Sequence, residues 1–499
     1  SASATLSTSA LTGGTHSITI AYSGDNNHST STSSSLSQVV NKASTTASVL
    51  SNNNPSTYAQ SITFTASVVP SAITGTIQFY DGTTSLGIVN VVNGSASLTS
   101  SALVKGTHPI SVVYSGDGNY STSTSLTLSQ VVNKLLTSTT SVSNNNPSVY
   151  GQSVSFTATV SPSSATGTVE FFDGNDLIGG ATVNNGSASV STSSLNSGTH
   201  TISTYYRGDT NHTTSFYNTL SQVVQKRSTT TALSSDNNPA RYEQSVTITA
   251  TVTPSTATGS MEFFDGKTSL GTANISNGVA TYTTSSFTVG SHSLNAVYSG
   301  DGNNLTSTSN TLSQFIQKAI TSTSLSSDNN LSVYGNSVTF TASVSPSTVT
   351  GSIEFFDGTV SLGVVACSLG TASYSSSSLV GGTHSITAVY SGDGNYLTST
   401  SSGLSQVVNK ANSSIDISSG NNPSIFGQSI TFSVSVSPDG VTGSVHIYDG
   451  ETSLAIVNLS NASATYSTSA LSSGNHNIWA SYSGDGNYNT STSTSTTQT

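Results

Sequence analysis

The chain repeats itself every 92 residues, and this periodicity constrains its fold more than any other feature. The tetrapeptide Tyr-Ser-Gly-Asp begins at residues 22, 114, 298, 390 and 482, and a variant begins at Tyr206. Histidines, aromatic-Asp-Gly turns and the segment Leu-Ser-Gln-Val-Val-Asn-Lys keep the same step, without insertion or deletion. A period of this length is too long for most solenoid repeats and fits one small domain per repeat.

Lys134 and its equivalents end each repeat. We therefore expect an N-terminal segment, residues 1–42, followed by five modules: 43–134, 135–226, 227–318, 319–410 and 411–499. The N-terminal segment corresponds only to the second half of a module. The last module ends in a polar strand, because Thr494, Thr496 and Thr499 replace apolar residues of the earlier copies.

Each module is predicted to be all-β. Residues 153–160 (SVSFTATV) alternate apolar and hydroxyl side chains, as a half-buried strand does. Asp173-Gly174 and Asn185-Gly186 mark tight turns between further short strands. About seven strands with frequent turn signals indicate an antiparallel β-sandwich. For module 135–226 the expected strands are 137–142, 153–160, 168–172, 177–183, 187–191, 199–206 and 220–224.

The composition excludes several classes of function. The chain has 109 serines and 78 threonines, and only 6% of its residues are charged, against about 25% in ordinary domains. A disordered mucin-like stalk has such a composition, but the strand alternation favours folded modules whose hydroxyl groups face outward. Ten basic against 21 acidic residues leave no basic surface for nucleic acid, and no apolar run of 18 residues predicts a membrane span.

Four motifs of module 135–226 resemble the bacterial Ig-like domain repeats of large surface proteins. They are Tyr150-Gly-Gln-Ser-Val, Gly167-Thr-Val-Glu-Phe-Phe-Asp-Gly, Gly198-Thr-His-Thr-Ile and Tyr206-x-Gly-Asp, and their counterparts extend the resemblance over the whole chain. The resemblance implies an immunoglobulin-like sandwich in every module. It also implies an extracellular or cell-surface structural role, and no enzymatic one.

We therefore expect a stiff extracellular fibre, stalk or filament that associates with itself, head to tail or laterally. The alternative is the repeat region of an adhesin that binds carbohydrate or a host protein. About three residues separate the last strand of one module from the first of the next, which leaves little freedom for a hinge. The lysines at these junctions have two interpretations: bridges to acidic or carbonyl groups of the neighbouring module, or solubilising charges.

The N-terminal segment lacks half of a sandwich and should expose apolar strand faces. Two explanations stay open. The chain is a window from a longer repeat protein, which we favour, or the segment completes a domain of another subunit by strand complementation. The polar last strand is relevant to the second explanation. It lacks an apolar face, so a strand from another subunit could insert at its position.

No catalytic, cofactor-binding or metal-ligating set is predicted. The recurring histidines share strand faces with apolar residues and are interpreted as partly buried structural groups. The Asp-Gly-Asn loops offer oxygen atoms to calcium, but one carboxylate and one amide are fewer than the 6–8 ligands that calcium takes. Cys367 occupies an apolar core position. Trp479 is expected on an exposed strand face, either as a lateral contact or as a lone surface aromatic.

N-glycosylation is the modification that the sequence supports best. Acceptor sequons occur, several of them in turns, at Asn27, Asn93, Asn119, Asn185, Asn211, Asn274, Asn304, Asn330, Asn412, Asn458, Asn461 and Asn489.

Overall fold

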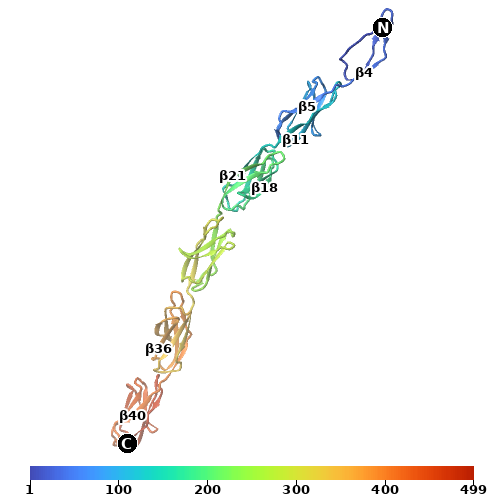
Figure 1. Ribbon diagram of the computed structural model, residues 1–499. Coiled ribbons are helices and arrows are strands. Elements are labelled where there is room, and N and C mark those ends of the chain that lie inside the picture. The colour runs from blue at the N-terminus through green and yellow to red at the C-terminus, as the bar shows by residue number, and fades with distance from the viewer. The chain divides into compact units, whose positions relative to one another are not determined.

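The computed structural model describes the backbone of residues 1–499 and all side chains except those of residues 218 and 219. The described residues form strands and turns and contain no helix, and hence none that is long and apolar enough to cross a membrane. They fall into two units, Ser1–Ser228 with Asp301–Leu305 and Thr229–Gly300 with Thr306–Thr499. Figure 1 colours the strands in chain order.

Module 43–134 shows the arrangement that the other modules repeat. Its strands are β5 (Thr46–Ser51), β6 (Ser56–Thr57), β7 (Ile62–Val69), β8 (Thr76–Asp81), β9 (Thr84–Asn90), β10 (Ser95–Ser100), β11 (Gly106–Tyr114), β12 (Ser123–Thr124) and β13 (Leu128–Asn133). One sheet has the order β10-β7-β5, and the facing sheet has the order β6-β13-β11-β8-β9. Pairing is antiparallel except between β6 and β13.

The other modules contain the corresponding strands with two exceptions: in module 135–226 one long strand includes the position of β12, and module 411–499 has no counterpart of β6. Module 135–226 has β14 (Ser138–Ser143), β15 (Ser148–Val149), β16 (Val154–Ser161), β17 (Thr168–Asp173), β18 (Asp176–Thr182), β19 (Ser187–Thr192), β20 (Gly198–Tyr206) and β21 (Ser215–Gln225). Module 227–318 has β22 (Thr230–Ser235), β23 (Ala240–Arg241), β24 (Val246–Thr253), β25 (Ser260–Asp265), β26 (Thr268–Asn274), β27 (Val279–Thr284), β28 (Gly290–Tyr298), β29 (Ser307–Thr308) and β30 (Leu312–Gln317).

Module 319–410 has β31 (Ser322–Ser327), β32 (Ser332–Val333), β33 (Val338–Ser345), β34 (Ser352–Asp357), β35 (Val360–Ala366), β36 (Thr371–Ser376), β37 (Gly382–Tyr390), β38 (Ser399–Thr400) and β39 (Leu404–Asn409). Module 411–499 has β40 (Ser414–Ser419), β41 (Ile430–Ser437), β42 (Ser444–Asp449), β43 (Thr452–Asn458), β44 (Ser463–Thr468), β45 (His476–Tyr482), β46 (Ser491–Thr492) and β47 (Thr496–Gln498).

The predicted all-β sandwich is confirmed. All seven strands expected in module 135–226 exist, with ends that differ by a few residues at most except at β21, which begins earlier. The short strand β15 was not predicted. It pairs in parallel with β21, 76 residues away in sequence at Ser148 and Val224, so no local pattern announces it.

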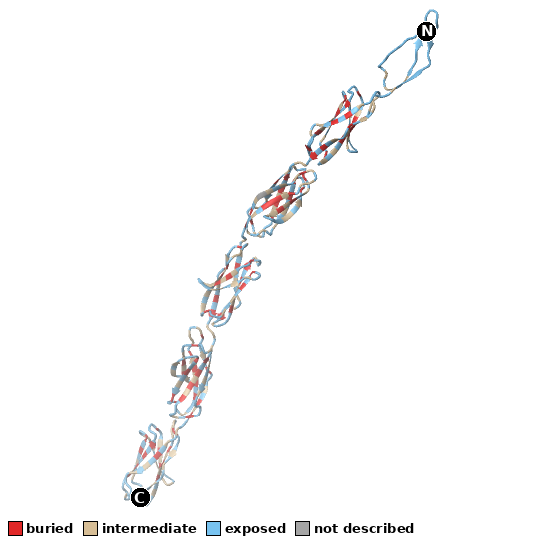
Figure 2. Cartoon of the chain, in the orientation of Figure 1, coloured by how far each residue is buried: buried red, intermediate tan, exposed pale blue. Residues whose placement is uncertain are grey.

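The core of each module lies between its two sheets, where apolar side chains alternate with hydroxyl-bearing ones. Phe64 and Ala66 on β7 and Ile110 on β11 are fully buried, while Thr63 on β7 is only half-buried and contacts Thr99 through its hydroxyl. Figure 2 shows the buried residues as short red stretches inside the full modules. The hydroxyl groups thus cover the outer faces, as the alternation predicts.

The N-terminal segment forms half of this arrangement. β1 (Gly14–Ile18) pairs with β4 (Leu36–Val40), and β2 (Ala21–Tyr22) pairs with β3 (Ser31–Thr32). Ile20 is 68% exposed and Leu36 is 65% exposed, and Figure 2 colours most of the segment as exposed. The prediction that this segment exposes apolar strand faces is confirmed.

The polar last strand remains part of its own module. β47 pairs antiparallel with β45 at His476–Gln498, Asn477–Thr497 and Ile478–Thr496. Gln498 is buried and donates a hydrogen bond to the carbonyl oxygen of Asn421. The position that a partner strand would take is therefore occupied by the chain itself.

Candidate functional site: the junctions between modules

The linkers between modules are short and attached to the downstream module. β13 ends at Asn133 and β14 begins at Ser138. Between them, Leu135 donates its N–H to the carbonyl of Asn211 (2.8 Å) and accepts from Thr213 (2.9 Å). At the junction between modules 227–318 and 319–410, Ala319 makes the same two bonds with Asn395 and Leu397. Both backbone groups of this linker residue are thus bonded to the downstream module.

The lysine that ends each module reaches across the junction. Lys134 Nζ donates to the backbone carbonyl of Asp209 at 2.5 Å, and Lys410 Nζ donates to that of Asp485 at 2.5 Å. Lys42 and Lys318 make the corresponding bonds to the carbonyls of Asp117 and Asp393. Of the two interpretations of these lysines, the bridge to carbonyl groups is confirmed.

A second contact joins the upstream backbone to an asparagine of the downstream Asp-x-Asn loop. The N–H of Gly13 donates to Asn119 Oδ1 at 2.8 Å, and the N–H of Lys105 donates to Asn211 Oδ1 at 2.9 Å. In the second unit, the N–H of Gly381 donates to Asn487 Oδ1 at 2.8 Å. Each of these loops therefore binds the preceding module through its asparagine side chain.

A third contact is a pair of rings. Tyr58 packs edge-on against His212 with ring centroids 5.4 Å apart and an interplanar angle of 76°. Tyr242 packs in the same way on Tyr396 (5.5 Å, 86°), and Tyr334 packs on Tyr488 (5.4 Å, 81°). Such edge-to-face pairs contribute about 0.5–1.5 kcal/mol beyond the area they bury. Sequence reasoning missed these tyrosines, although an aromatic residue recurs at the position of Tyr58 in every full module of the 92-residue register.

The aspartate of each loop is held by protein donors. Asp393 Oδ1 accepts the N–H groups of Asn395 (2.8 Å) and Tyr396 (2.9 Å), and Oδ2 accepts the N–H and hydroxyl of Thr350 (both 2.8 Å). Burial opposes ionisation, but these bonds outweigh it and lower the pKa of Asp393 to about 2. Hydrogen bonds thus fix the conformation of this turn. Its aspartate carbonyl and its asparagine side chain are the groups that contact the preceding module. The described residues contain no group of three His, Cys, Asp or Glu that could hold a metal ion.

Each full module also contains a histidine–aspartate pair. In module 319–410, His384 Nδ1 lies 2.6 Å from Asp357 Oδ2, and its Nε2 lies 2.8 Å from the carbonyl oxygen of Val380. Burial lowers the pKa of His384, but the two acceptors outweigh it and raise that pKa overall. The partly buried structural histidine is confirmed. Sequence reasoning missed its partner, although histidine and aspartate recur in step at His108–Asp81, His200–Asp173, His292–Asp265, His384–Asp357 and His476–Asp449.

The glycosylation sequons occupy different environments. Asn93 and Asn185 lie exposed in turns. Asn119 and Asn211 use their side-chain oxygens at junctions. Asn304 is 3% exposed and donates to the Asp301 carboxylate, so the folded chain has no room for a glycan there. Glycosylation at the other sequons stays a prediction; they are Asn27, Asn93, Asn119, Asn185, Asn211, Asn274, Asn330, Asn412, Asn458, Asn461 and Asn489, all exposed except the half-buried Asn211.

Two single residues differ from expectation. Trp479 is half-buried rather than exposed, because it stacks on Tyr448 of the neighbouring strand at 4.3 Å and donates Nε1–H to the carbonyl of Gly450 at 2.8 Å. Cys367 is half-buried at the edge of its core, and burial raises the pKa of its thiol. A lateral contact through Trp479 stays a prediction.

Comparison with known proteins identifies the repeated unit. The sequence profile of the bacterial Ig-like domain (group 3) matches residues 49–133, 140–225, 233–317, 325–409 and 417–499. No curated protein sequence matches the chain. The matches cover most of the sequence and confirm both the predicted resemblance and the tandem Ig-like sandwiches.

Solved structures that resemble the chain are distant. The fibronectin(III)-like modules of Clostridium thermocellum CbhA are 18% identical, with 36% of this chain and 94% of that one covered and a TM-score of 0.17. The Escherichia coli adhesin FdeC is 13% identical, with 54% and 96% covered and a TM-score of 0.21. The human OSCAR ligand-binding domain is 17% identical, with 35% and 97% covered and a TM-score of 0.17.

Proposed function

Because the chain belongs to the bacterial Ig-like domain (group 3) family, we propose that it is the structural repeat region of a surface or extracellular protein. Its role is mechanical, as a stiff fibre or stalk. The observation that carries this proposal is the recurrence of the same three contacts, lysine to carbonyl, backbone to asparagine and ring to ring, at junctions in both units. Repeats of this family are typically structural modules without enzymatic activity.

The junction contacts support a stiff array of modules. Each neutral hydrogen bond contributes about 0.5–1.5 kcal/mol, and a bond from an ammonium group contributes somewhat more. We therefore expect that a large bend or twist about the linker breaks one or more of these contacts. The surface complements this role, since a net charge of −11 over 499 residues limits repulsion between packed copies.

The bending of single molecules tests the proposal. Replacing Lys134, Lys318 and Lys410 together by Met removes three ammonium bridges and keeps similar side-chain length. We expect a wider distribution of angles between consecutive modules in electron micrographs of the variant. The matched control is Lys267→Met, which changes an exposed lysine in a hairpin turn. Equal angle distributions in all three proteins would contradict the proposal.

Electron microscopy of the native source separates a fibre from an adhesin. Continuous filaments with an axial repeat near the length of one module, roughly 35–40 Å, support the structural fibre. Discrete rods, with binding of a carbohydrate or host protein confined to one module, would favour the adhesin instead.

A further inference from the structure

Module 135–226 differs from the other full modules on one of its sheets. The residues that occur there in this module alone are Leu177, Gly180, Tyr205, Arg207 and Phe216. The other full modules have serine at the positions of Leu177 and Arg207 and threonine at the position of Phe216. All of these residues lie on strands β18, β20 and β21 or directly follow one of them, so the changes gather on the five-stranded sheet.

Strand pairing places these residues side by side on the outer face of that sheet. Glu170 on β17 is directly opposite Gly180 on one neighbouring strand and Tyr205 on the other, and Tyr205 is opposite Phe216. The two residues that flank Glu170 in sequence are fully buried, so Glu170 and the residues opposite it face outward. Because neighbouring strands lie about 4.8 Å apart, this row across four strands is about 15 Å long.

Arg207 connects the members of the row. Its Nε and Nη2 both donate to Glu170 Oε2, at 3.0 and 2.6 Å, and its Cζ lies 4.9 Å from the centre of the Tyr205 ring. Tyr205 packs on Phe216 with ring centroids 6.3 Å apart and an interplanar angle of 61°. Within the described part of the chain, Arg207 Nη1 and Glu170 Oε1 have no hydrogen-bond partner. We call these four residues, together with Leu177 and Gly180, the aromatic patch.

The changes do not serve the stability of the module. Elsewhere the serine at the position of Arg207 supports the backbone, as Ser391 Oγ does by accepting the N–H of Ser352 at 3.1 Å. Arg207 gives up this bond. Leu177 is 59% exposed and Phe216 is 55% exposed, so both bury little apolar surface. Exposed apolar side chains in place of small hydroxyl-bearing ones indicate a binding surface.

Gly180 opens the row next to Glu170. The other full modules carry Ile, Thr or Val at this position, and Val364 in module 319–410 is 62% exposed. Neither packing nor backbone geometry requires the glycine. A Cβ atom at Gly180 would lie 3.6 Å from its nearest contact, Thr168 Cγ2, and the φ angle of Gly180 is not positive. A glycine inside a strand weakens the strand and often marks a place where a ligand comes close.

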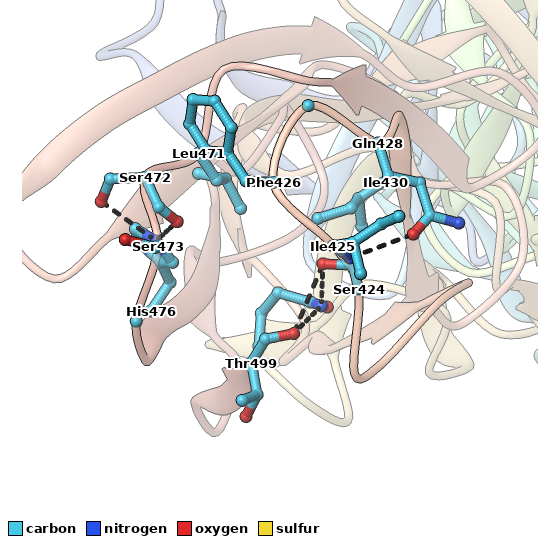
Figure 3. Close-up of a pocket in the computed structure, with 13 residues that line it drawn as sticks. Ser424, Ile425, Phe426, Gln428, Ile430, Leu471, Ser472, Ser473, His476 and Thr499 are labelled. Carbon is cyan, nitrogen blue, oxygen red and sulfur yellow. Dashed lines mark hydrogen bonds between the residues drawn. The ribbon is translucent and has the colours of Figure 1, made fainter.

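An exposed ring elsewhere has a different explanation. Phe426 is 80% exposed beside a pocket of about 170 Å³, which Figure 3 shows with Ile425 and Leu471. Phe426 occupies the position of Tyr334, which packs on a ring of the following module, so an aromatic residue is the rule there. Phe216 stands at a position that is threonine in every other full module, and no junction contact explains it.

We propose that the aromatic patch binds a neutral carbohydrate. Phe216 supports the C–H face of a sugar ring, because these hydrogens carry partial positive charge and the face of an aromatic ring is negative. Arg207 Nη1 donates to one sugar hydroxyl and Glu170 Oε1 accepts from another, in charge-assisted hydrogen bonds. Tyr205 positions both Arg207 and Phe216. The inference goes beyond the proposed mechanical role and applies to a filament and a discrete rod alike.

Charge and size favour this ligand over others. The pair of Arg207 and Glu170 is neutral overall in a chain of net charge −11, so the patch offers no excess of positive charge to an anionic ligand. A purely apolar ligand would remove water from the ion pair without replacing its hydrogen bonds. A specific protein interface covers about 800 Å² on each partner, more than a row about 15 Å long provides. A ligand with hydroxyl edges and apolar ring faces meets all three conditions.

Saturation-transfer NMR with the full chain, produced without glycosylation, tests the proposal. The neutral probes are trisaccharides of glucose, mannose, galactose and N-acetylglucosamine, and the acidic probe is trigalacturonic acid. We expect a neutral probe to bind with a dissociation constant on the order of 1 mM, because the patch is shallow. Absence of binding by every neutral probe at about 10 mM overturns the proposal. Tighter binding of the acidic probe overturns it as well.

Three substitutions restore residues that the other modules carry, so the variants should fold: Tyr205→Val, Arg207→Ser and Phe216→Thr. Arg207→Ser and Phe216→Thr should each weaken binding about fivefold or more, and the triple variant should not bind. The matched control is Val364→Thr, which removes an exposed apolar side chain from the corresponding sheet of module 319–410 and should bind like the wild type. Unchanged binding in the triple variant overturns the proposal.

Transplanting the patch tests whether these residues suffice. Module 319–410 already has Glu354 at the position of Glu170. The changes needed there are Ser361→Leu, Val364→Gly, Val389→Tyr, Ser391→Arg and Thr400→Phe. Added to the triple variant, they should restore binding of the same probe, and a folded graft that does not bind overturns the proposal.

A protein partner would give a different result. Self-association of the chain that Phe216→Thr removes, without binding of any sugar, would assign the patch to a protein contact and overturn the proposal. None of these measurements reports on the angles between modules. The proposed stiffness of the chain is therefore judged separately, from the electron micrographs of the lysine variant.

Discussion

The strands of the N-terminal segment have counterparts in the same register in module 43–134, but the two regions differ in burial. β1 pairs with β4 from Gly14–Val40 to Ile18–Leu36, and β11 pairs with β13 from Gly106–Val132 to Ile110–Leu128. Yet Tyr22 is 43% exposed and Tyr114 is fully buried. Strand pairing within one sheet thus needs only the second half of the repeat, whereas burial needs the facing sheet of β5, β7 and β10.

The two tyrosines also have different hydrogen-bond partners. Tyr114 donates its hydroxyl to the carbonyl of Thr74 at 2.6 Å, a residue of the first half of its module. Burial raises the pKa of Tyr114 to about 12. Tyr22 has no such carbonyl and donates to the Asp25 carboxylate at 2.9 Å, which raises its pKa. A core position of the repeat therefore becomes a surface position when half of the repeat is missing.

The largest expected effect comes from removing these rings. Tyr114→Ala should destabilise module 43–134 by about 3–5 kcal/mol, because it leaves a cavity and an unpaired carbonyl at Thr74. Tyr22→Ala removes a ring without a core around it and should leave the stability of the modules unchanged. Hydrogen exchange followed by mass spectrometry, read on peptides from residues 43–134, measures both. Equal protection in the two variants would contradict the difference in burial.

A smaller effect concerns the aspartate loops. In the last module, Thr442 of the first half donates its N–H and hydroxyl to Asp485 Oδ2, both at 2.9 Å. Despite opposing burial, these and the loop N–H groups lower the pKa of Asp485 to about 2. The pKa of Asp485 is thus lower in the folded chain than its unfolded value of about 3.9. The carboxylate therefore stabilises the folded module fully above pH 4, and this stabilisation disappears as the pH falls toward 2.

Asp485→Asn tests this pH dependence. The amide has one acceptor oxygen in place of two, so it cannot keep both the Thr442 bonds and the loop N–H bonds. The last module should therefore lose about 1–2 kcal/mol at pH 7, because the carboxylate is only partly solvated. Its stability should then vary less between pH 4 and pH 2 than that of the wild type. Urea unfolding at several pH values, followed by the fluorescence of the single Trp479, reports on this module. A wild type with constant stability over that range would show that the carboxylate contributes nothing.

The smallest effect concerns the histidines. In the N-terminal segment, His16 has a carbonyl partner in Thr12 at 2.6 Å, but the aspartate half of the pair is missing from the segment. In module 319–410, His384 has Asp357 as well, and its pKa is raised despite burial. A raised folded pKa stabilises below the unfolded value of about 6.5, and this contribution is lost as the pH rises through the folded pKa.

His384→Gln should therefore cost module 319–410 about 0.5–1 kcal/mol at pH 6 and less at pH 9. Hydrogen exchange of peptides from residues 352–390, corrected for the pH dependence of the intrinsic rate, measures the difference. The control is His16→Gln, for which we expect no change in that module. A cost that is equal at both pH values would assign the histidine a packing role only.

The sequence predicted more of the fold than of the contacts at the junctions. The alternation in residues 153–160 and the turns at Asp173 and Asn185 are local signals, so the strands around them were predicted. The junction lysines were also identified, because they end every repeat. The ring pair of Tyr58 and His212 was missed, since the two residues lie 154 positions apart and belong to different modules.

By itself, the sequence determined the strands, the turns, the 92-residue period and the outward hydroxyl faces, because each depends on neighbouring residues. Only the tertiary structure decided which copies of a repeated residue are buried or bonded. His28 and His212 occupy the same place in the repeat, and one is open to solvent while the other is enclosed. The physical reason is that burial and junction contacts depend on partners from a facing sheet or a preceding module, whose presence no local pattern encodes.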